Sequence, residues 1–184
     1  QQPTSGREHP IEIRIGVGSC ALASGAAPVQ AALEDVVASF GGGASVKAVG
    51  CSGFCHHEPL VEIVAPGQRQ FYGSVSPDDV RRIVREHVRP VGISRVVREG
   101  VNDIRARLVD DRAWEPISAR AVDPTPYARQ QVRVVLENCG QIDPLSLDDY
   151  RRREGMQALE HCLTRLTPEQ VIEQVRMSGL RGRG

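Results

Sequence analysis

Apolar and polar residues alternate in the first part of the chain in patterns that predict strands and helices in turn. Residues 11–15 have the sequence Ile-Glu-Ile-Arg-Ile, and this strict alternation is typical of a half-buried β-strand. Residues 28–40 place apolar side chains at helical spacing, and the glycines that follow Phe40 end this helix. Short strands are then predicted at 46–49, 60–64 and 70–72.

A hairpin and a second amphipathic helix complete this region. Pro66 and Gly67 separate the last two strands and predict the hairpin turn. Ser76 precedes Pro77, and this pair predicts a helix start with Ser as the N-cap. The predicted order is therefore β-α-β-β-β-α over residues 11–89, which indicates an α/β fold with a small core of its own.

The remaining sequence changes character twice. Residues 90–128 scatter arginines among prolines and predict an extended linker that could lie across a partner. Apolar residues return after it, in the stretch that begins at Gln131. We therefore expect a domain at 11–89, a linker at 90–128 and the first part of a second, helical domain at 129–184.

Capping signals place the helices of this last part. Ser146 is the expected N-cap of a helix that runs towards Leu163 with a bend near Gly155. Thr167 starts another helix, with Gln170 in the capping-box position, and we expect the helix to end at the glycine at position 179.

Charge and composition narrow the possible functions. The 23 Lys and Arg residues balance the 23 Asp and Glu residues, which argues against a protein that binds nucleic acid through bulk positive charge. No apolar run approaches the roughly 20 residues that span a bilayer. The chain begins at Gln1 without an export signal, so we expect a cytoplasmic protein. It ends within a glycine-rich run at 181–184, from which we expect an incomplete polypeptide.

Five cysteines carry the candidate chemistry, and three of them are grouped. The odd number and the missing export signal argue against a disulfide framework. Cys51 and Cys55 form a C-x3-C pair in a glycine-containing loop, and Cys20 follows Gly16 and Gly18 in a similar loop. Such loops suit a thiolate-ligated iron–sulfur cluster, and zinc is less favoured because its sites more often use C-x2-C or C-x4-C pairs.

The ligand set leaves alternatives open. A cluster of this kind normally takes four protein ligands. His56 or His57 could be the fourth ligand, or the pair could belong to a solvated loop. A free cysteine is often a small buried hydrophobic residue, and this is our interpretation of Cys139 and Cys162.

Two sets of residues resemble one family. The first set resembles the thioredoxin-like ferredoxin domain that precedes NADH-binding flavoprotein subunits in NAD(P)-linked hydrogenases and formate dehydrogenases, and it comprises residues 18–26, 50–55, 58–62, Tyr72 and 76–77. The second set is similar to the entry into the flavin- and NADH-binding subunit of respiratory complex I, and it comprises residues 130–144 and 178–184.

The resemblance implies cofactors and their residues. It implies a 2Fe-2S cluster held by Cys20, Cys51 and Cys55, although the family's first loop carries two cysteines spaced C-x4-C and only Cys20 is present here. It further implies that Gly182, Arg183 and Gly184 begin the glycine-rich loop that cradles the FMN phosphate beside the NADH site. The rest of that loop would lie beyond position 184, so we do not expect this chain alone to bind FMN or NAD(P)H or to be an active enzyme.

Three functions are consistent with these features of the sequence. The first is the N-terminal part of an electron-transfer subunit, which passes electrons between NAD(P)H, FMN and iron–sulfur clusters in a complex with other iron–sulfur subunits. The second is a thioredoxin-like docking or assembly module that has lost its cluster. The third is a thiol redox protein, which is less favoured because C-x3-C is not the C-x-x-C of thioredoxin chemistry.

Overall fold

The computed structural model describes residues 11–41, 43–90, 96–97, 100–101, 104, 120–122 and 130–181 of the 184-residue chain. The chain divides into two units, Gln1–Pro144 and Leu145–Gly184.

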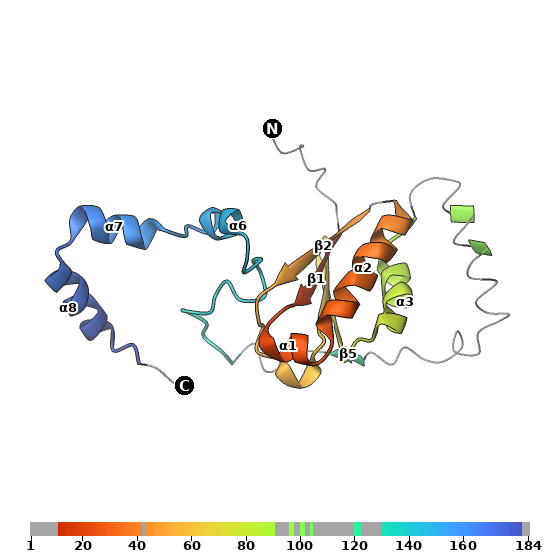
Figure 1. Ribbon diagram of the computed structural model, residues 1–184, viewed down its shortest axis with the longest axis horizontal. Helices are drawn as coiled ribbons and strands as arrows, with labels where there is room; N and C mark the ends of the chain where they lie inside the picture. The colour runs from red at the N-terminus through yellow and green to blue at the C-terminus, as the bar shows by residue number, and fades with distance from the viewer. Residues whose placement is uncertain are drawn as a thin grey trace. The chain divides into compact units, whose positions relative to one another are not determined.

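A mixed β-sheet forms the centre of the first unit (Figure 1). In the described part of the chain the sheet has five strands: β1 (Ile11–Gly16), β2 (Ala44–Val49), β3 (Val61–Ala65), β4 (Gln68–Gly73) and β5 (Arg120–Val122). Their spatial order is β2-β1-β3-β4-β5, with β1 and β2 parallel and the other neighbours antiparallel. A parallel pair needs a crossover connection, and a helix between β1 and β2 supplies it here.

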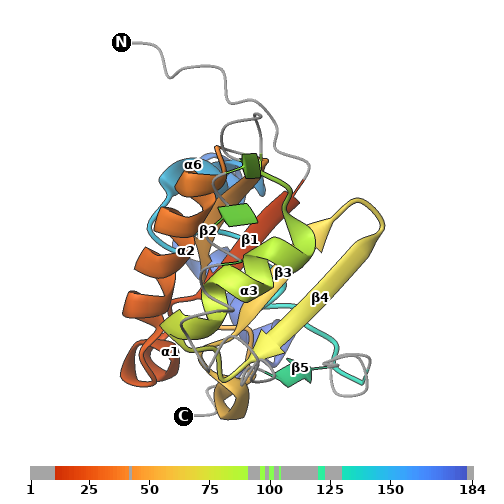
Figure 2. The same cartoon turned by 90° about the vertical axis from the view of Figure 1, so that its right-hand side faces the viewer.

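Two helices cover one face of this sheet (Figure 2). They are α2 (Ala26–Phe40), which joins β1 to β2, and α3 (Pro77–His87), which follows β4. The alternation of β1 turns Ile13 and Ile15 toward one side of the sheet, and both are fully buried. They belong to one apolar core with Leu33 and Phe40 of α2 and Ile83 of α3.

The intervening residues of the strands form a network of charges. Glu62 of β3 is only 6% exposed, and its carboxylate pairs with Arg69 of β4 and lies 3.6 Å from the guanidinium of Arg14. Arg14 also pairs with Glu12 on its own strand. A buried carboxylate of this kind needs such cationic partners, because burial without them would cost several kcal/mol.

The predicted α/β class and the predicted β-α-β-β-β-α order are confirmed. The hairpin is also as predicted, since Ala65 pairs with Gln68 across the two turn residues and Gly67 has a positive φ of 74°. Ser76 and Pro77 open α3, and the Ser76 backbone N–H donates to the Asp79 carboxylate at 3.1 Å.

The structure adds two short elements that the pattern did not indicate. Helix α1 (Ser19–Ala23) follows β1 directly and contains Cys20. Strand β5 lies within the range that the sequence assigned to a linker, and it pairs with the end of β4. Both elements are too short to show a period in the sequence, so they depend on tertiary contacts.

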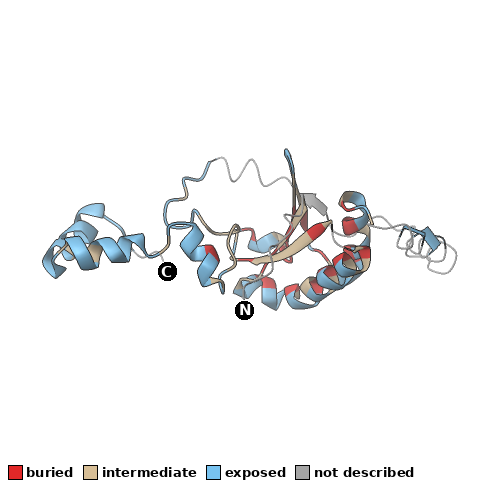
Figure 3. Cartoon of the chain, turned by 90° about the horizontal axis from the view of Figure 1, so that it is seen from above, coloured by how far each residue is buried: buried red, intermediate tan, exposed pale blue. Residues whose placement is uncertain are grey.

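The second unit consists of helices that expose most of their surface (Figure 3). Its helices are α6 (Leu147–Arg152), α7 (Gln157–Arg165) and α8 (Pro168–Ser178). The expected caps are present: Asp149 N–H donates to Ser146 Oγ at 3.2 Å, and Thr167 N–H donates to Gln170 Oε1 at 2.8 Å. Gly179 ends α8 in the left-handed conformation, as expected.

The bend expected near Gly155 is a complete break between α6 and α7. Glu154 and Met156 both have positive φ angles, of 62° and 75°, so the helical path cannot continue. Gly155 fits against Tyr150 so closely that a Cβ at this position would lie 2.4 Å from the Tyr150 ring and carbonyl oxygen. A side chain at position 155 would therefore force this turn apart.

No helix among the described residues has the length and apolarity that a membrane span requires.

Candidate functional site

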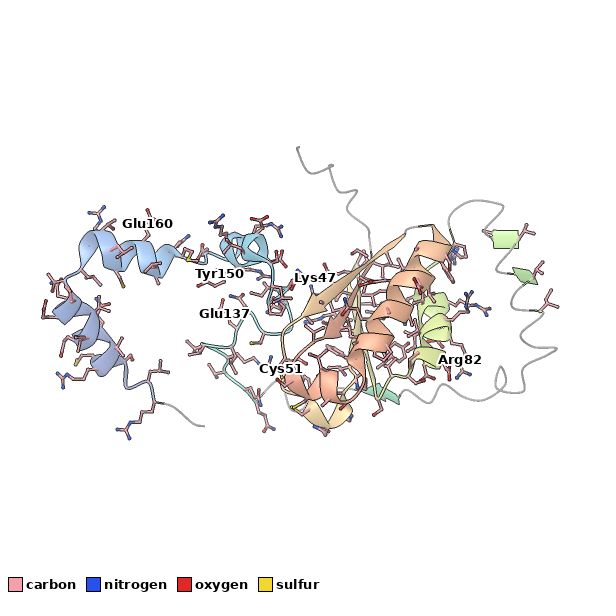
Figure 4. All side chains as sticks on the ribbon, in the orientation of Figure 1. Lys47, Cys51, Arg82, Glu137, Tyr150 and Glu160 are labelled. Atoms are coloured by element: carbon pink, nitrogen blue, oxygen red, sulfur yellow. The ribbon has the colours of Figure 1, made fainter. Side chains whose placement is uncertain are left out.

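Two loops bring the grouped cysteines to one end of the sheet. One loop leaves β1 and leads into α1 with Cys20, and the other leaves the parallel strand β2 and leads to Cys51. Because β1 and β2 run parallel and in register, their carboxyl ends lie next to each other. Figure 4 labels Cys51 and shows it close to α1.

Glycine makes the close approach of the two loops possible. A Cβ on Gly18 would lie 3.1 Å from the Cβ of Cys51, which is tighter than almost all real contacts of this kind. Gly53 has a φ of 88°, and its backbone N–H donates to Cys51 Sγ at 3.4 Å. Gly18 thus lets the two loops pack together, and Gly53 directs a backbone N–H to one of the sulfurs.

The Cys55 thiol interacts with both of the other thiols. Cys55 opens the short 3-10 helix Cys55–His57, and the pKa of its thiol is raised, mainly by a hydrogen bond and a charge interaction with Cys20. A hydrogen bond with Cys51 acts on the Cys55 pKa in the opposite direction. Cys20, Cys51 and Cys55 are all exposed. The structure therefore brings the three predicted ligands together at the surface.

The chemistry of this set fits a thiolate-bound metal centre in part. Among the described residues, no three His, Cys, Asp or Glu side chains are arranged to hold a single metal ion. A two-iron cluster is larger than one ion and distributes its thiolate ligands over two metals, so its ligands need not converge on one point. The hydrogen bond with Cys20, and then the charge of Cys20, raise the pKa of the Cys55 thiol, and iron bound to both sulfurs would favour their thiolate forms.

The structure does not single out a fourth ligand. The imidazoles of His56 and His57 contact each other with ring centroids 4.0 Å apart, and His56 is exposed. The two remaining cysteines, Cys139 and Cys162, are half-exposed, so the interpretation of these two as buried core residues is wrong.

A buried carboxylate lies just beyond the Cys55 turn. Glu58 is 8% exposed, and burial raises the pKa of its carboxyl even though Leu60 N–H donates to Oε2 at 2.8 Å. A Cβ on Gly16, the last residue of β1, would lie 3.1 Å from Glu58 Oε1. Glu58 thus links the segment after the cysteine loop to the end of β1.

A segment far along the chain also contacts the cysteine loop, and the sequence pattern did not indicate this contact. The Arg133 guanidinium donates to the Ser52 carbonyl oxygen at 2.7 Å, and Gly50 N–H donates to the Ile142 carbonyl oxygen at 3.3 Å. Gly140, with a φ of 76°, approaches Ser52 so closely that a Cβ on it would lie 3.3 Å from Ser52 Cβ. No local pattern predicts a contact between residues 81 positions apart.

The predicted flavin-contacting residues Gly182, Arg183 and Gly184 lie outside the described residues.

Parts of the chain are similar to subunits of NAD(P)-linked enzymes. It is 48% identical over 56 residues to the NADP-reducing hydrogenase subunit HndC of Solidesulfovibrio fructosivorans, a match that covers 30% of this chain and 11% of HndC. It is 32% identical over 78 residues to HndB of the same hydrogenase, covering 41% of this chain and 62% of HndB. The F subunit of the NADH-quinone oxidoreductase of Escherichia coli K12 is 42% identical over 41 residues, a match that covers 22% of this chain and 9% of that protein.

Among solved structures, the chain is similar to a thioredoxin-like [2Fe-2S] ferredoxin from Aquifex aeolicus. The sequence identity is 23% and the TM-score 0.38, and the match covers 44% of this chain and 90% of the ferredoxin. No family model matches the chain. The chain spans about a tenth of the length of HndC and of the quinone oxidoreductase protein, and 62% of the length of HndB.

Proposed function

We propose that this chain provides an iron–sulfur electron-transfer domain to an NAD(P)H-dependent oxidoreductase complex. The observation that carries the proposal is the meeting of Cys20, Cys51 and Cys55 at one exposed end of the sheet, on two glycine-containing loops. The relatives support it, because their names are those of an NADP-reducing hydrogenase and an NADH-quinone oxidoreductase.

In this proposal the three cysteines hold a 2Fe-2S cluster as thiolates. The cluster supplies one-electron chemistry when bound. Exposure of all three thiols leaves a partner redox centre room to approach the site. Hydrogen bonds to the sulfurs tune the reduction potential of such centres. The backbone N–H of Gly53 donates to Cys51 Sγ, and this hydrogen bond would favour the reduced state of the cluster.

The test is the iron content and spectrum of protein purified without oxygen. We expect iron and acid-labile sulfide in the native chain, a visible absorption band, and an electron paramagnetic resonance signal after reduction. Replacing Cys20, Cys51 or Cys55 singly by Ser should lower the iron content and alter the signal. Cys162→Ser, in helix α7, is the matched control and should leave both unchanged.

Two outcomes would count against this proposal. A native chain without iron or a reducible signal would contradict it, and intact assembly with partner subunits would then favour the docking module. Reduction of an insulin disulfide by the iron-free chain would instead favour the thiol redox protein.

We further propose that Gly182, Arg183 and Gly184 begin the phosphate-cradling loop of an FMN and NADH site in the complete protein. The resemblance of residues 178–184 to the flavoprotein family supports this assignment. The 184-residue chain should show no saturable quenching of FMN fluorescence, because three residues supply too few backbone N–H groups to hold a phosphate. Saturable quenching by this chain would contradict the assignment of the site to a longer polypeptide.

A further inference from the structure

Residues 130–144, here called the clasp, contact the cysteine loop through three residues. Arg133 donates to the carbonyl of Ser52, Gly140 packs on the side chain of Ser52, and the Ile142 carbonyl accepts from Gly50 N–H. These contacts involve the residues on both sides of Cys51 in sequence. They lie within the first unit, so the clasp and the loop belong to the same part of the fold.

The contact made by Arg133 differs in kind from the other two. A guanidinium carries a positive charge and offers five N–H donors. One of its terminal nitrogens lies 2.7 Å from the Ser52 oxygen, and the same nitrogen would lie 3.9 Å from a Cβ on Gly53. A full positive charge is therefore fixed against the peptide units between Cys51 and Cys55.

We infer that the clasp is part of the cluster site, with Arg133 positioning the Cys51–Cys55 loop and placing a positive charge beside it. This inference rests on the proposed function for its electronic part. The structural part of the inference, that Arg133 holds the loop, does not depend on the presence of iron.

Two physical consequences follow. The hydrogen bond to Ser52 restricts a loop whose cysteines are exposed and whose Gly53 gives the backbone freedom, so the sulfurs keep their spacing. Thiolates and sulfides make a 2Fe-2S centre anionic, and an added electron makes it more so. A nearby fixed cation therefore favours the reduced state and raises the reduction potential.

Three substitutions separate the charge from the hydrogen bond. Arg133→Lys keeps the charge and one donor, Arg133→Gln keeps a donor without the charge, and Arg133→Met removes both. Arg165→Met, on the exposed surface of α7, is the control for loss of an arginine. The measurements are hydrogen exchange of residues 50–57 in the iron-free chain, the rate of iron loss to a chelator, and the midpoint potential.

For Arg133→Met we expect exchange at residues 50–57 and iron loss to be roughly three- to tenfold faster, with a more negative potential. Arg133→Gln should show the negative potential with nearly native exchange, and Arg133→Lys should stay close to the native chain in both. Native exchange and native potential in all three variants would overturn the inference.

The outcomes distinguish this inference from the proposed function. If the native chain holds no iron, the proposed function fails, and hydrogen exchange alone then decides whether Arg133 holds the loop. If iron is present and the potential does not follow the charge at position 133, the electronic part is wrong while the proposed function stands.

Discussion

Tyr72 shows how a polar group is accommodated within an aliphatic core. It lies on β4 and is 6% exposed, and its hydroxyl donates to Glu86 Oε2 at 2.9 Å and lies 2.8 Å from His87 Nε2. Burial, followed by the hydrogen bond and the charge of Glu86, raises the pKa of this phenol, and burial lowers the pKa of the His87 imidazole. The hydroxyl therefore stays protonated and joins β4 to the last turn of α3.

Removing this hydroxyl should weaken the first unit. Tyr72→Phe keeps the ring in the core but leaves Glu86 and His87 without their shared partner. We expect a loss of about 1–2 kcal/mol in the free energy of unfolding, measured by urea denaturation. Tyr150→Phe, at a residue that is 43% exposed, should change the stability much less, and equal effects would contradict this account.

Glu58 should lower the free energy of unfolding as the pH rises, which is opposite to the usual effect of a carboxylate in a folded protein. Its pKa is raised in the folded chain, so the folded state keeps a proton that the unfolded chain has already lost. The contribution of Glu58 to stability therefore falls as the pH rises from the ordinary glutamate pKa through the raised one, and it stays low above that.

Glu58→Gln tests this sign. The amide oxygen can still accept from Leu60 N–H, and the variant carries no charge to bury. We expect the variant to be more stable than the native chain at neutral pH, with the difference shrinking as the pH falls below the raised pKa. Urea midpoints of both proteins across a pH series measure the difference, and a constant difference would show that charge is not the cause.

At the scale of elements, the sequence predicted those whose residues repeat with a clear period or carry a cap. The strand at 11–15, the helix that ends at Phe40 and the capping box at Thr167 and Gln170 are all present. Helix α1 has five residues and no period, and β5 has three residues that pair with β4. Their contacts, and not their own sequences, determine that they form.

Helix α2 should be the most sensitive element of the first unit. Leu33 is completely buried between the sheet and the rest of the core, so Leu33→Ala leaves a cavity. We expect this change to cost about 2–5 kcal/mol in the free energy of unfolding, measured by chemical denaturation. Ile172→Ala in α8, at a side chain that is 68% exposed, is the control and should cost little.

At the scale of the whole molecule, the candidate site combines residues that the sequence could and could not connect. Cys51 and Cys55 are neighbours in sequence, and Cys20 could be added because a similar glycine loop surrounds it. The clasp could not be predicted to belong to the site, because no motif or periodicity around Arg133 or Ser52 indicates that the two residues are in contact. The valines beside Arg133 predicted an apolar segment, yet Val132, Val134 and Val135 are 73–92% exposed.

The division of the chain after Pro144 gives a prediction for truncated forms. A chain of residues 1–144 keeps the clasp, and a chain of residues 1–129 loses it. The longer form should keep the melting temperature of the first unit and the native rate of iron loss, while the shorter one should lose iron faster. Calorimetry and chelator assays on the two forms measure this, and identical behaviour would argue against a role for the clasp.

The contact between Arg133 and Ser52 couples the clasp to the proposed cluster site in both directions. If contact with the clasp raises the affinity of the proposed site for iron by some factor, bound iron strengthens the contact of the clasp with the loop by the same factor. The reason is that the two equilibria share one coupling free energy. Loss of iron would then loosen a stretch about eighty residues away along the chain and open it to proteases. If the proposed cluster is present, limited proteolysis should therefore cut residues 130–144 sooner in the iron-free chain than in the iron-loaded chain.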